Sequence, residues 1–307
     1  MSHPLVSIIV PNYNHATYLE QRLDSVFNQT FTDYEVILLD DASTDASIKL
    51  LGSYRSHPKV THVVINERNS GSPFLQWQKG IELAKGKYIW IAESDDWADG
   101  LLLEKLVETL EKDGNIQLVY CASYRTESDG EVIGQHQWAS VLDDKKWTID
   151  YINNGQREIE QYLQFRNTIP NASAVVFRRS AVLTARDYIS FRYSGDWALW
   201  LHIVNQGKIA YVAEPLNYFR RGEQSLTLQR TDITKEEKKL KEYIQNIRNA
   251  QHLIQQKSAF QKKHLWMLNE WLRRYDLFKN NIRYYFPDLP FSLSLWFYFL
   301  LAKKILR

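Results

Sequence analysis

The stretch "YIWIAESDDW" (Tyr88–Trp97) sets a short apolar run directly before three acids, Glu93, Asp95 and Asp96. Such a run, bounded by polar residues, is typical of a buried strand. Carboxylates crowded at the end of a strand repel one another unless a cation lies among them. The stretch therefore predicts a strand that ends at a cation-binding site.

Apolar runs elsewhere in the first 125 residues repeat this order of strand, polar loop and helix. Strands that alternate with helices favour a doubly wound, mainly parallel α/β sheet. Ligands bind such a sheet outside the carboxyl ends of its strands, where this chain carries acids and amides. The predicted strands are 5–10, 34–39, 61–65, 88–91 and 118–123, and the predicted helices are 17–29, one from near Asp45 with Ser43 and Thr44 as candidate caps, 74–84 and 101–112.

The pattern loosens after residue 125. We expect a helix over 157–165, a strand over 173–177, and a helix in "SGDWALWLHIV" (194–204), whose tryptophans recur at helical spacing. From 228 onward Lys, Glu and Gln dominate with helical periodicity. This composition predicts a C-terminal helical appendage over 228–307.

The composition narrows the partners and the compartment. The 38 Lys and Arg residues nearly balance the 36 Asp and Glu residues, so net charge gives no reason to expect nucleic acid as a partner. The single Cys121 lies in an apolar run, which predicts a buried thiol and a reducing compartment. The start of the chain lacks a signal-peptide pattern, and no apolar span reaches about 18 residues. We therefore expect a cytoplasmic protein.

Two common nucleotide-binding motifs are excluded. The stretch "GIELAKGK" (80–87) has five residues between its glycines and is followed by Tyr88, where a Walker A loop needs Ser or Thr. No G-x-G-x-x-G follows a predicted strand, which argues against a dinucleotide-dependent dehydrogenase.

Several stretches, in order, resemble the motifs of the family 2 glycosyltransferases of the GT-A fold. They are "VSIIVPNYN", "VILLDDASTD", "NSG", "KGKYIWIAESDDW", and "SGDWALWL" followed by "EPLNYFRR". The resemblance covers about residues 4–227. It implies an inverting transferase that moves a sugar from a nucleotide-sugar, foremost a UDP-sugar, to a glycan or a lipid-linked oligosaccharide of the cell envelope. It also implies a GT-A domain over 1–227, with a nucleotide-binding half (1–125) and an acceptor half (126–227).

The resemblance implies a set of nucleotide contacts. Asp40 and Asp41 match the family's base-binding acids, and a carboxylate can accept the imide N–H of uracil, which cytosine lacks. The alternative is that these two acids only cap the next helix. The other implied nucleotide-binding residues are Pro11, Asn12, Tyr13, Lys79, Asp96, Arg220 and Arg221.

The acids of "ESDD" stand where the family has its D-x-D metal motif. Mn²⁺ and Mg²⁺ take oxygen ligands, and one or two carboxylates with the diphosphate oxygens complete an octahedron. The resemblance makes Asp95 the principal ligand. Glu93 replaces the usual first Asp and ligates the metal directly or through water, while Asp96 supports the ligands or orients the sugar. The alternative is that these acids cap the helix expected at 101.

Asp196 matches the family's general base, which takes the proton of the acceptor hydroxyl. The alternative is a helix N-cap. Two residues depart from the family pattern: Gly195 stands in place of the usual Glu, and Gly222 in place of a His. They leave open a catalytically inactive, nucleotide-sugar-binding scaffold. A sugar nucleotidyltransferase is a further alternative, although "PNYNHA" (11–16) lacks the glycine-rich, basic loop it needs.

The tail "FSLSLWFYFLLAKKILR" (291–307) ends an apolar run with three cations. Two interpretations remain open. The segment contacts the inner face of the cell membrane peripherally, with its cations at anionic headgroups, or it packs on the core.

Overall fold

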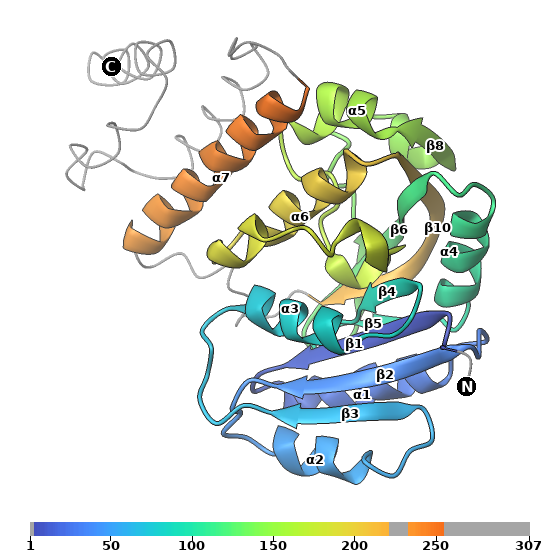
Figure 1. Ribbon diagram of the computed structural model, residues 1–307, viewed down its shortest axis with the longest axis vertical. Coiled ribbons are helices and arrows are strands. Elements are labelled where there is room, and N and C mark those ends of the chain that lie inside the picture. Colours follow the sequence, from blue (N-terminus) through green and yellow to red (C-terminus); the bar gives the residue numbers. More distant parts are fainter. Residues whose placement is uncertain (1–2, 221–232, 255–307) are drawn as a thin grey trace.

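A computed structural model describes residues 3–220 and 233–254 (Figure 1). In this part of the chain ten strands form one sheet in the order β3-β2-β1-β4-β9-β6-β10-β5, with β7 paired to β6 and β8 to β10. The strands are β1 Val6–Asn12, β2 Tyr34–Asp40, β3 Val60–Ile65, β4 Tyr88–Ile91, β5 Trp97–Ala98, β6 Ile116–Thr126, β7 Val132–Gln135, β8 Tyr151–Asn154, β9 Val175–Arg178 and β10 Lys208–Arg220. The helices are α1 Ala16–Phe27, α2 Ser47–Ser53, α3 Pro73–Leu83, α4 Leu102–Glu111, α5 Gly155–Glu158, α6 Gly195–Val204 and α7 Ile233–Leu253.

The predicted α/β fold class is confirmed. Strands β3, β2, β1 and β4 run parallel, and β6 and β10 form a second parallel pair. Consecutive side chains of one strand point to opposite faces of the sheet, and each face is covered by its own hydrophobic core. Ile8 packs with α1 and α4, and Ile9 packs with α3 and α6. Both faces of the sheet are thus covered, which explains why its central strands read as continuous apolar runs.

One local prediction, the capping of α2, was wrong. Helix α2 begins at Ser47, and neither Ser43 nor Thr44 caps it; the Oδ1 atom of Asp45 accepts the N–H of Ser47 instead. Ser43 is held in the preceding loop, where its hydroxyl donates to Asp40. The helix expected over 157–165 is present over residues 155–163, as the short α5 followed by a π-helical turn over Ile159–Leu163.

Strand β10 was missed by the sequence analysis. Pro215 lies near its middle and cannot donate a backbone N–H to the sheet. The pairing of β10 with β6 shifts register on both sides of Pro215, so a bulge accommodates the proline. The strand then continues to Arg220 and carries the "NYFR" stretch to the edge of the sheet where Asp95 and Asp96 lie.

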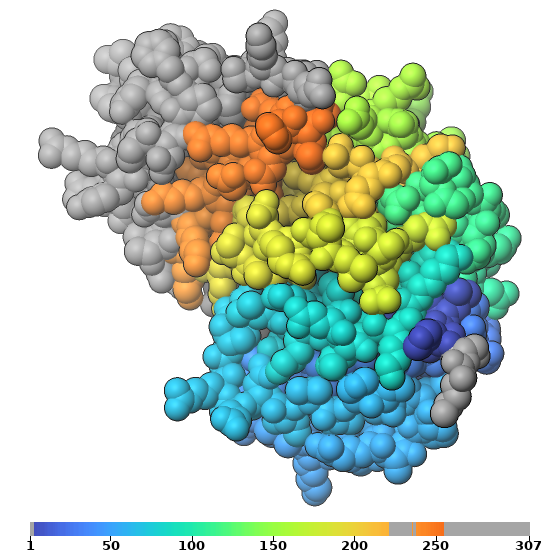
Figure 2. Space-filling view, in the orientation of Figure 1, coloured from blue at the N-terminus to red at the C-terminus, as the bar shows by residue number. Residues whose placement is uncertain are grey.

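The part of the predicted appendage that the structure describes is α7. This helix lies along α6, and Figure 2 shows its surface against the yellow region that includes α6. Ile247 and Ala250 are fully buried in the core that α6 also lines. Arg221 and the tail 291–307 lie outside the described residues. Within the described ranges, no helix is long and apolar enough to cross a membrane.

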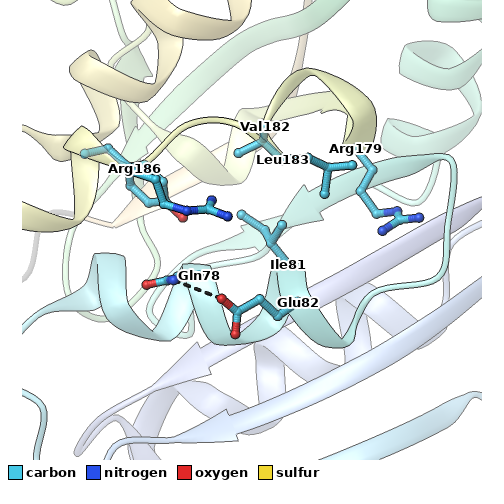
Figure 3. A pocket seen from close by; sticks show the side chains of 8 residues that line it. Gln78, Ile81, Glu82, Arg179, Val182, Leu183 and Arg186 are labelled. Carbon is cyan, nitrogen blue, oxygen red and sulfur yellow. Dashed lines mark hydrogen bonds between the residues drawn. The ribbon is translucent and has the colours of Figure 1, made fainter.

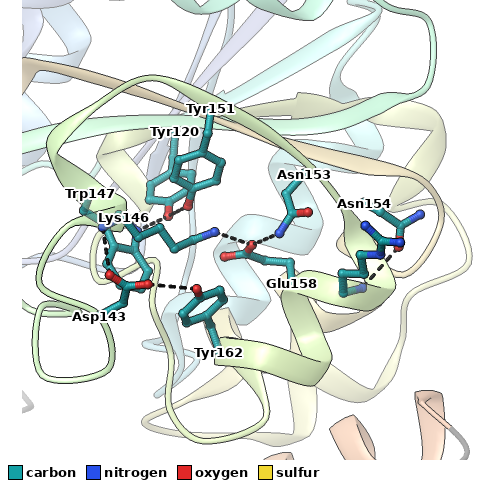
Figure 4. Close-up of polar contacts among 10 residues, drawn as sticks. Tyr120, Asp143, Lys146, Trp147, Tyr151, Asn153, Asn154, Glu158 and Tyr162 are labelled. Carbon is teal, nitrogen blue, oxygen red and sulfur yellow. Dashed lines mark hydrogen bonds and ion pairs between the residues drawn. The ribbon is translucent and has the colours of Figure 1, made fainter.

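A buried polar cluster lies in the part of the chain that follows residue 125 (Figure 4). The ammonium of Lys146 lies 2.8 Å from Oε2 of Glu158, whose side chain is fully buried. The same ammonium lies 3.8 Å from the ring centroid of Tyr151 and 4.3 Å from that of Tyr162. Polar side chains are therefore part of the buried core here, which is why the apolar pattern loosens after residue 125.

Candidate active site at the carboxyl edge of the sheet

The parallel register brings the polar strand ends together. Asn12 at the end of β1 is paired directly with Asp40 at the end of β2. The Nδ2 group of Asn12 donates to Oδ2 of Asp40 over 2.7 Å. Asn14 and Ala42 follow these strands with φ angles of 55° and 63°, a left-handed conformation that costs energy in residues other than glycine. Such backbone clusters at functional sites.

Asp40 and Asp41 are buried, and each carboxylate accepts several hydrogen bonds from the protein. Asp40 accepts the N–H and the hydroxyl of Ser43, each over 2.7 Å. Asp41 accepts bonds from Asn66, Ser70 and Gln76. These partners lie in the loops and on α3, so neither acid caps α2. Their fixed positions suit a recognition role, and contact with a base stays a prediction.

Three further residues that were predicted to bind the nucleotide are Lys79, Tyr13 and Pro11. The ammonium of Lys79 on α3 donates to the side-chain oxygen of Asn66, which in turn donates to Asp41. Lys79 is therefore linked to the predicted base site through one residue. Tyr13 directly follows β1 and is 44% exposed, and Pro11 is buried in β1.

The acids after β4 have different surroundings. Glu93 accepts the indole N–H of Trp77 over 2.7 Å. Asp96 accepts the backbone N–H of Arg220 and the amide of Asn171, each over 3.0 Å. The carboxylate of Asp95 accepts no hydrogen bond from a described residue. None of the three caps α4, whose N-cap is Leu101.

Two protein cations lie among these acids, and the sequence analysis missed the first of them. Arg22 is fully buried, and its Nε donates to the carbonyl of Glu93 over 2.8 Å. Its two terminal nitrogens have no hydrogen-bond partner among the described residues. Burial lowers the pKa of Arg22 to about 10, although Asp96, Asp95 and Glu93 oppose that shift. The burial of Arg22 could have been predicted from the sequence, because Arg22 follows Leu19 by three positions and so lies on the apolar face of the helix.

Arg220 is the second cation. Its Nε donates to the carbonyl of Asp95, its Nη1 to the carbonyl of Ser128 and its Nη2 to Gln21. The guanidinium also lies over the rings of Tyr18 and Trp97. Arg220 is thus at the site as predicted, but its side chain is held by the protein. The crowded acids are accordingly offset in part by resident arginines, and contact of Arg220 with a diphosphate stays a prediction.

Asp95 and Glu93 remain suited to a divalent cation. Burial, reinforced by neighbouring Asp95, raises the pKa of Glu93 to about 8 and that of Asp96 to about 7. The raised pKa values reflect the cost of ionising neighbouring buried carboxyl groups, and a bound cation lowers that cost. Among the described residues no group of three or more His, Cys, Asp or Glu is placed to hold a metal. A site that shares its ion with a diphosphate needs only one or two carboxylates, so Asp95 with Glu93 as ligands stays a prediction.

Asp196 lies in the first turn of α6, whose N-cap is Ser194. Its Oδ2 accepts the side-chain amide of Asn167 over 2.7 Å. Burial raises the pKa of Asp196 to about 7, and hydrogen bonds from Trp197 and Asn167 oppose that shift. A carboxyl group with such a pKa can accept a proton near neutral pH.

Steric crowding explains why position 195 is a glycine and not the Glu that is usual in the family. A Cβ atom at this position would lie 2.4 Å from the carbonyl oxygen of Tyr188 and 2.7 Å from the ring of Phe74. A Glu cannot fit here without moving the backbone.

One loop holds both groups of acids. Asn167 bonds to Asp196, and Asn171, four positions later, bonds to Asp96. The loop therefore fixes the candidate base relative to the candidate metal site.

A separate hollow lies between α3 and residues 179–188 (Figure 3). Its lining includes Ile81, Arg179, Val182 and Arg186. No predicted site residue lines it, so it is distinct from the candidate active site.

A mainly parallel sheet with acids gathered at its carboxyl edge is the arrangement that the family motifs predict for a glycosyltransferase of the GT-A fold. The chain belongs to glycosyl transferase family 2, whose model matches residues 7–184. An uncharacterized glycosyltransferase of Haemophilus influenzae is 28% identical over 247 residues, which cover 78% of this chain and 72% of that protein.

Two further similarities extend the comparison. Chondroitin synthase of Escherichia coli is 32% identical over 137 residues, 44% of this chain and only 20% of that much longer protein. The crystal structure of S. aureus TarS 1-349 in complex with UDP-GlcNAc superposes with a TM-score of 0.62 at 18% identity, covering 90% of this chain and 73% of that one. This structural similarity supports the fold.

Proposed function

We propose that the protein is an inverting, metal-dependent glycosyltransferase that moves a sugar from a UDP-sugar to a hydroxyl of a glycan or of a lipid-linked oligosaccharide. The observation that carries this proposal is the pair of acid sites held by one loop, Asp96 through Asn171 and Asp196 through Asn167. A displacement at an anomeric carbon needs a base on the acceptor side and stabilisation on the diphosphate side. TarS, which was crystallised with UDP-GlcNAc, makes UDP-sugars the first donors to test.

In the proposed reaction the acceptor oxygen forms a bond to the anomeric carbon while the bond from that carbon to the diphosphate breaks on the opposite face. The proton of the hydroxyl passes to Asp196. Its pKa of about 7 allows the ionised form to be abundant at neutral pH while it still accepts the proton. The amide of Asn167 orients the accepting carboxylate.

The donor half has its own residues. Asp40 and Asp41 would accept hydrogen bonds from the base, with Asn12 and Lys79 beside them. A divalent cation held by Asp95 and Glu93 would neutralise charge on the departing nucleoside diphosphate. Peripheral membrane contact through 291–307 would place the site near a lipid-linked acceptor.

The test begins with a thermal-shift panel of nucleotide-sugars with and without Mn²⁺, because a ligand that binds only the folded state raises the melting temperature. Turnover of the best donor is then compared between the unmodified protein and Asp196→Asn. The amide retains the shape of the carboxylate but cannot take the proton, so we expect transfer to fall by at least about a hundredfold while donor binding is kept. Asp144→Asn, at an exposed acid, is the matched control.

Two results would contradict the proposal. Asp196→Asn turnover within a few-fold of the unmodified enzyme would place the base elsewhere. Binding of UDP without consumption of any donor, by water or by acceptor, would favour the inactive scaffold.

A further inference from the structure

Trp138, in the loop after β7, is fixed although it is exposed. Its side chain is 42% exposed. The indole N–H donates to the carbonyl of Asn167 over 2.8 Å. The guanidinium of Arg166 lies 3.9 Å from the ring centroid, and the ring of His136 lies 5.9 Å away at an interplanar angle of 22°. A single exposed apolar residue is ordinary, but one held by three neighbours is a rigid surface.

Two series of contacts link Trp138 to the two acid sites. On one side, Asn167 accepts from Trp138 with its carbonyl and donates to Asp196 with its side chain. On the other side, the ring of His136 lies 5.4 Å from that of Phe219, and the next residue, Arg220, donates its N–H to Asp96. An acceptor must lie between the base and the diphosphate. Trp138 is therefore beside the space that the acceptor has to occupy.

We propose that Trp138 is a stacking platform for the sugar ring that carries the accepting hydroxyl. The inference rests on the function proposed above and narrows its acceptor to a ring sugar. The apolar C–H face of a pyranose matches the flat indole, which offers a large contact area at little cost in side-chain entropy. An open-chain polyol has no such flat C–H face, so stacking on the indole adds little to its binding.

The test uses saturation-transfer NMR on the full chain in the presence of UDP and Mn²⁺. The probes are methyl glycosides of glucose, galactose, N-acetylglucosamine and N-acetylgalactosamine, with ribitol as the open-chain comparison. Trp138→Phe and Trp138→Leu both lose the bond to Asn167, and only the first keeps an aromatic face. Val141→Ala, at another exposed residue of the same half, is the control.

We expect the unmodified protein, Val141→Ala and Trp138→Phe to transfer saturation to at least one glycoside. Trp138→Leu weakens that binding by about tenfold, as loss of an aromatic contact does. UDP affinity stays unchanged in all four proteins. Equal glycoside binding by Trp138→Leu, no glycoside bound by the unmodified protein, or ribitol bound as well as the glycosides would each overturn the platform. None of these results bears on donor consumption, whose absence would instead overturn the proposed function.

Discussion

Glu242 on α7 holds the segment that leads into α6 and the candidate base. Its buried carboxylate accepts the backbone N–H groups of Arg192, Tyr193 and Ser194 over 2.7, 2.8 and 3.0 Å. Hydrogen bonds to a charged group contribute about 1.5–3 kcal/mol each. The segment is half-buried, so water replaces part of what is lost and the low end of that range applies. At about 1.5 kcal/mol for each of the three bonds, Glu242→Ala should therefore lower the free energy of unfolding by about 4.5 kcal/mol.

Urea unfolding followed by tryptophan fluorescence measures this loss, with an unchanged m-value as the sign that only stability has changed. Glu242→Gln retains one acceptor oxygen and should lose about half as much. Gln245→Ala changes an exposed position of the same helix and should remain within about 0.5 kcal/mol of the unmodified protein. A loss below about 1 kcal/mol for Glu242→Ala would refute the reasoning, because α7 would then not support the start of α6.

Three further outcomes are expected. Lys146→Met leaves the buried carboxylate of Glu158 without its cation and should cost about 3–5 kcal/mol in urea unfolding; a loss comparable to that of an exposed substitution would show that the pair is not a structural element. Asp95→Ala should abolish the strengthening of UDP binding by Mn²⁺ in calorimetric titration, and equal UDP affinity with metal and with chelator in the unmodified protein would contradict the metal site. The pKa of Asp196 is raised to about 7 and its ionised form is the active one, so kcat/KM should fall as pH drops through about 7 and level off above it; a flat profile between about pH 5 and 8 would argue against this base.

The sequence was sufficient for the elements whose pattern is local. Strands such as Val6–Asn12 and Tyr88–Ile91 are short apolar runs followed by polar residues, and their helices follow at regular intervals. The carboxyl ends of parallel strands lie at one edge of a sheet. That rule alone was enough to expect Asp40, Asp41 and the acids of "ESDD" at one site.

The sequence was insufficient where a strand breaks the usual pattern. In β10, Pro215 and polar neighbours hide a long strand that only its bulged pairing with β6 reveals. The caps of α2 were also misassigned, because Ser43 is a good cap by type but its hydroxyl is taken by Asp40 in the folded loop.

The amino-acid sequence by itself determined the α/β class, the order of the main elements and the family motifs, because these depend on residues close together along the chain. Tertiary structure alone decided that Arg22 lies beneath acids some seventy positions later, that Asn167 holds Asp196, and that Glu242 supports the start of α6. Each of these contacts joins residues from separate elements. Their partners are chosen by packing and by the need to satisfy buried charge, neither of which leaves a periodic trace in the chain.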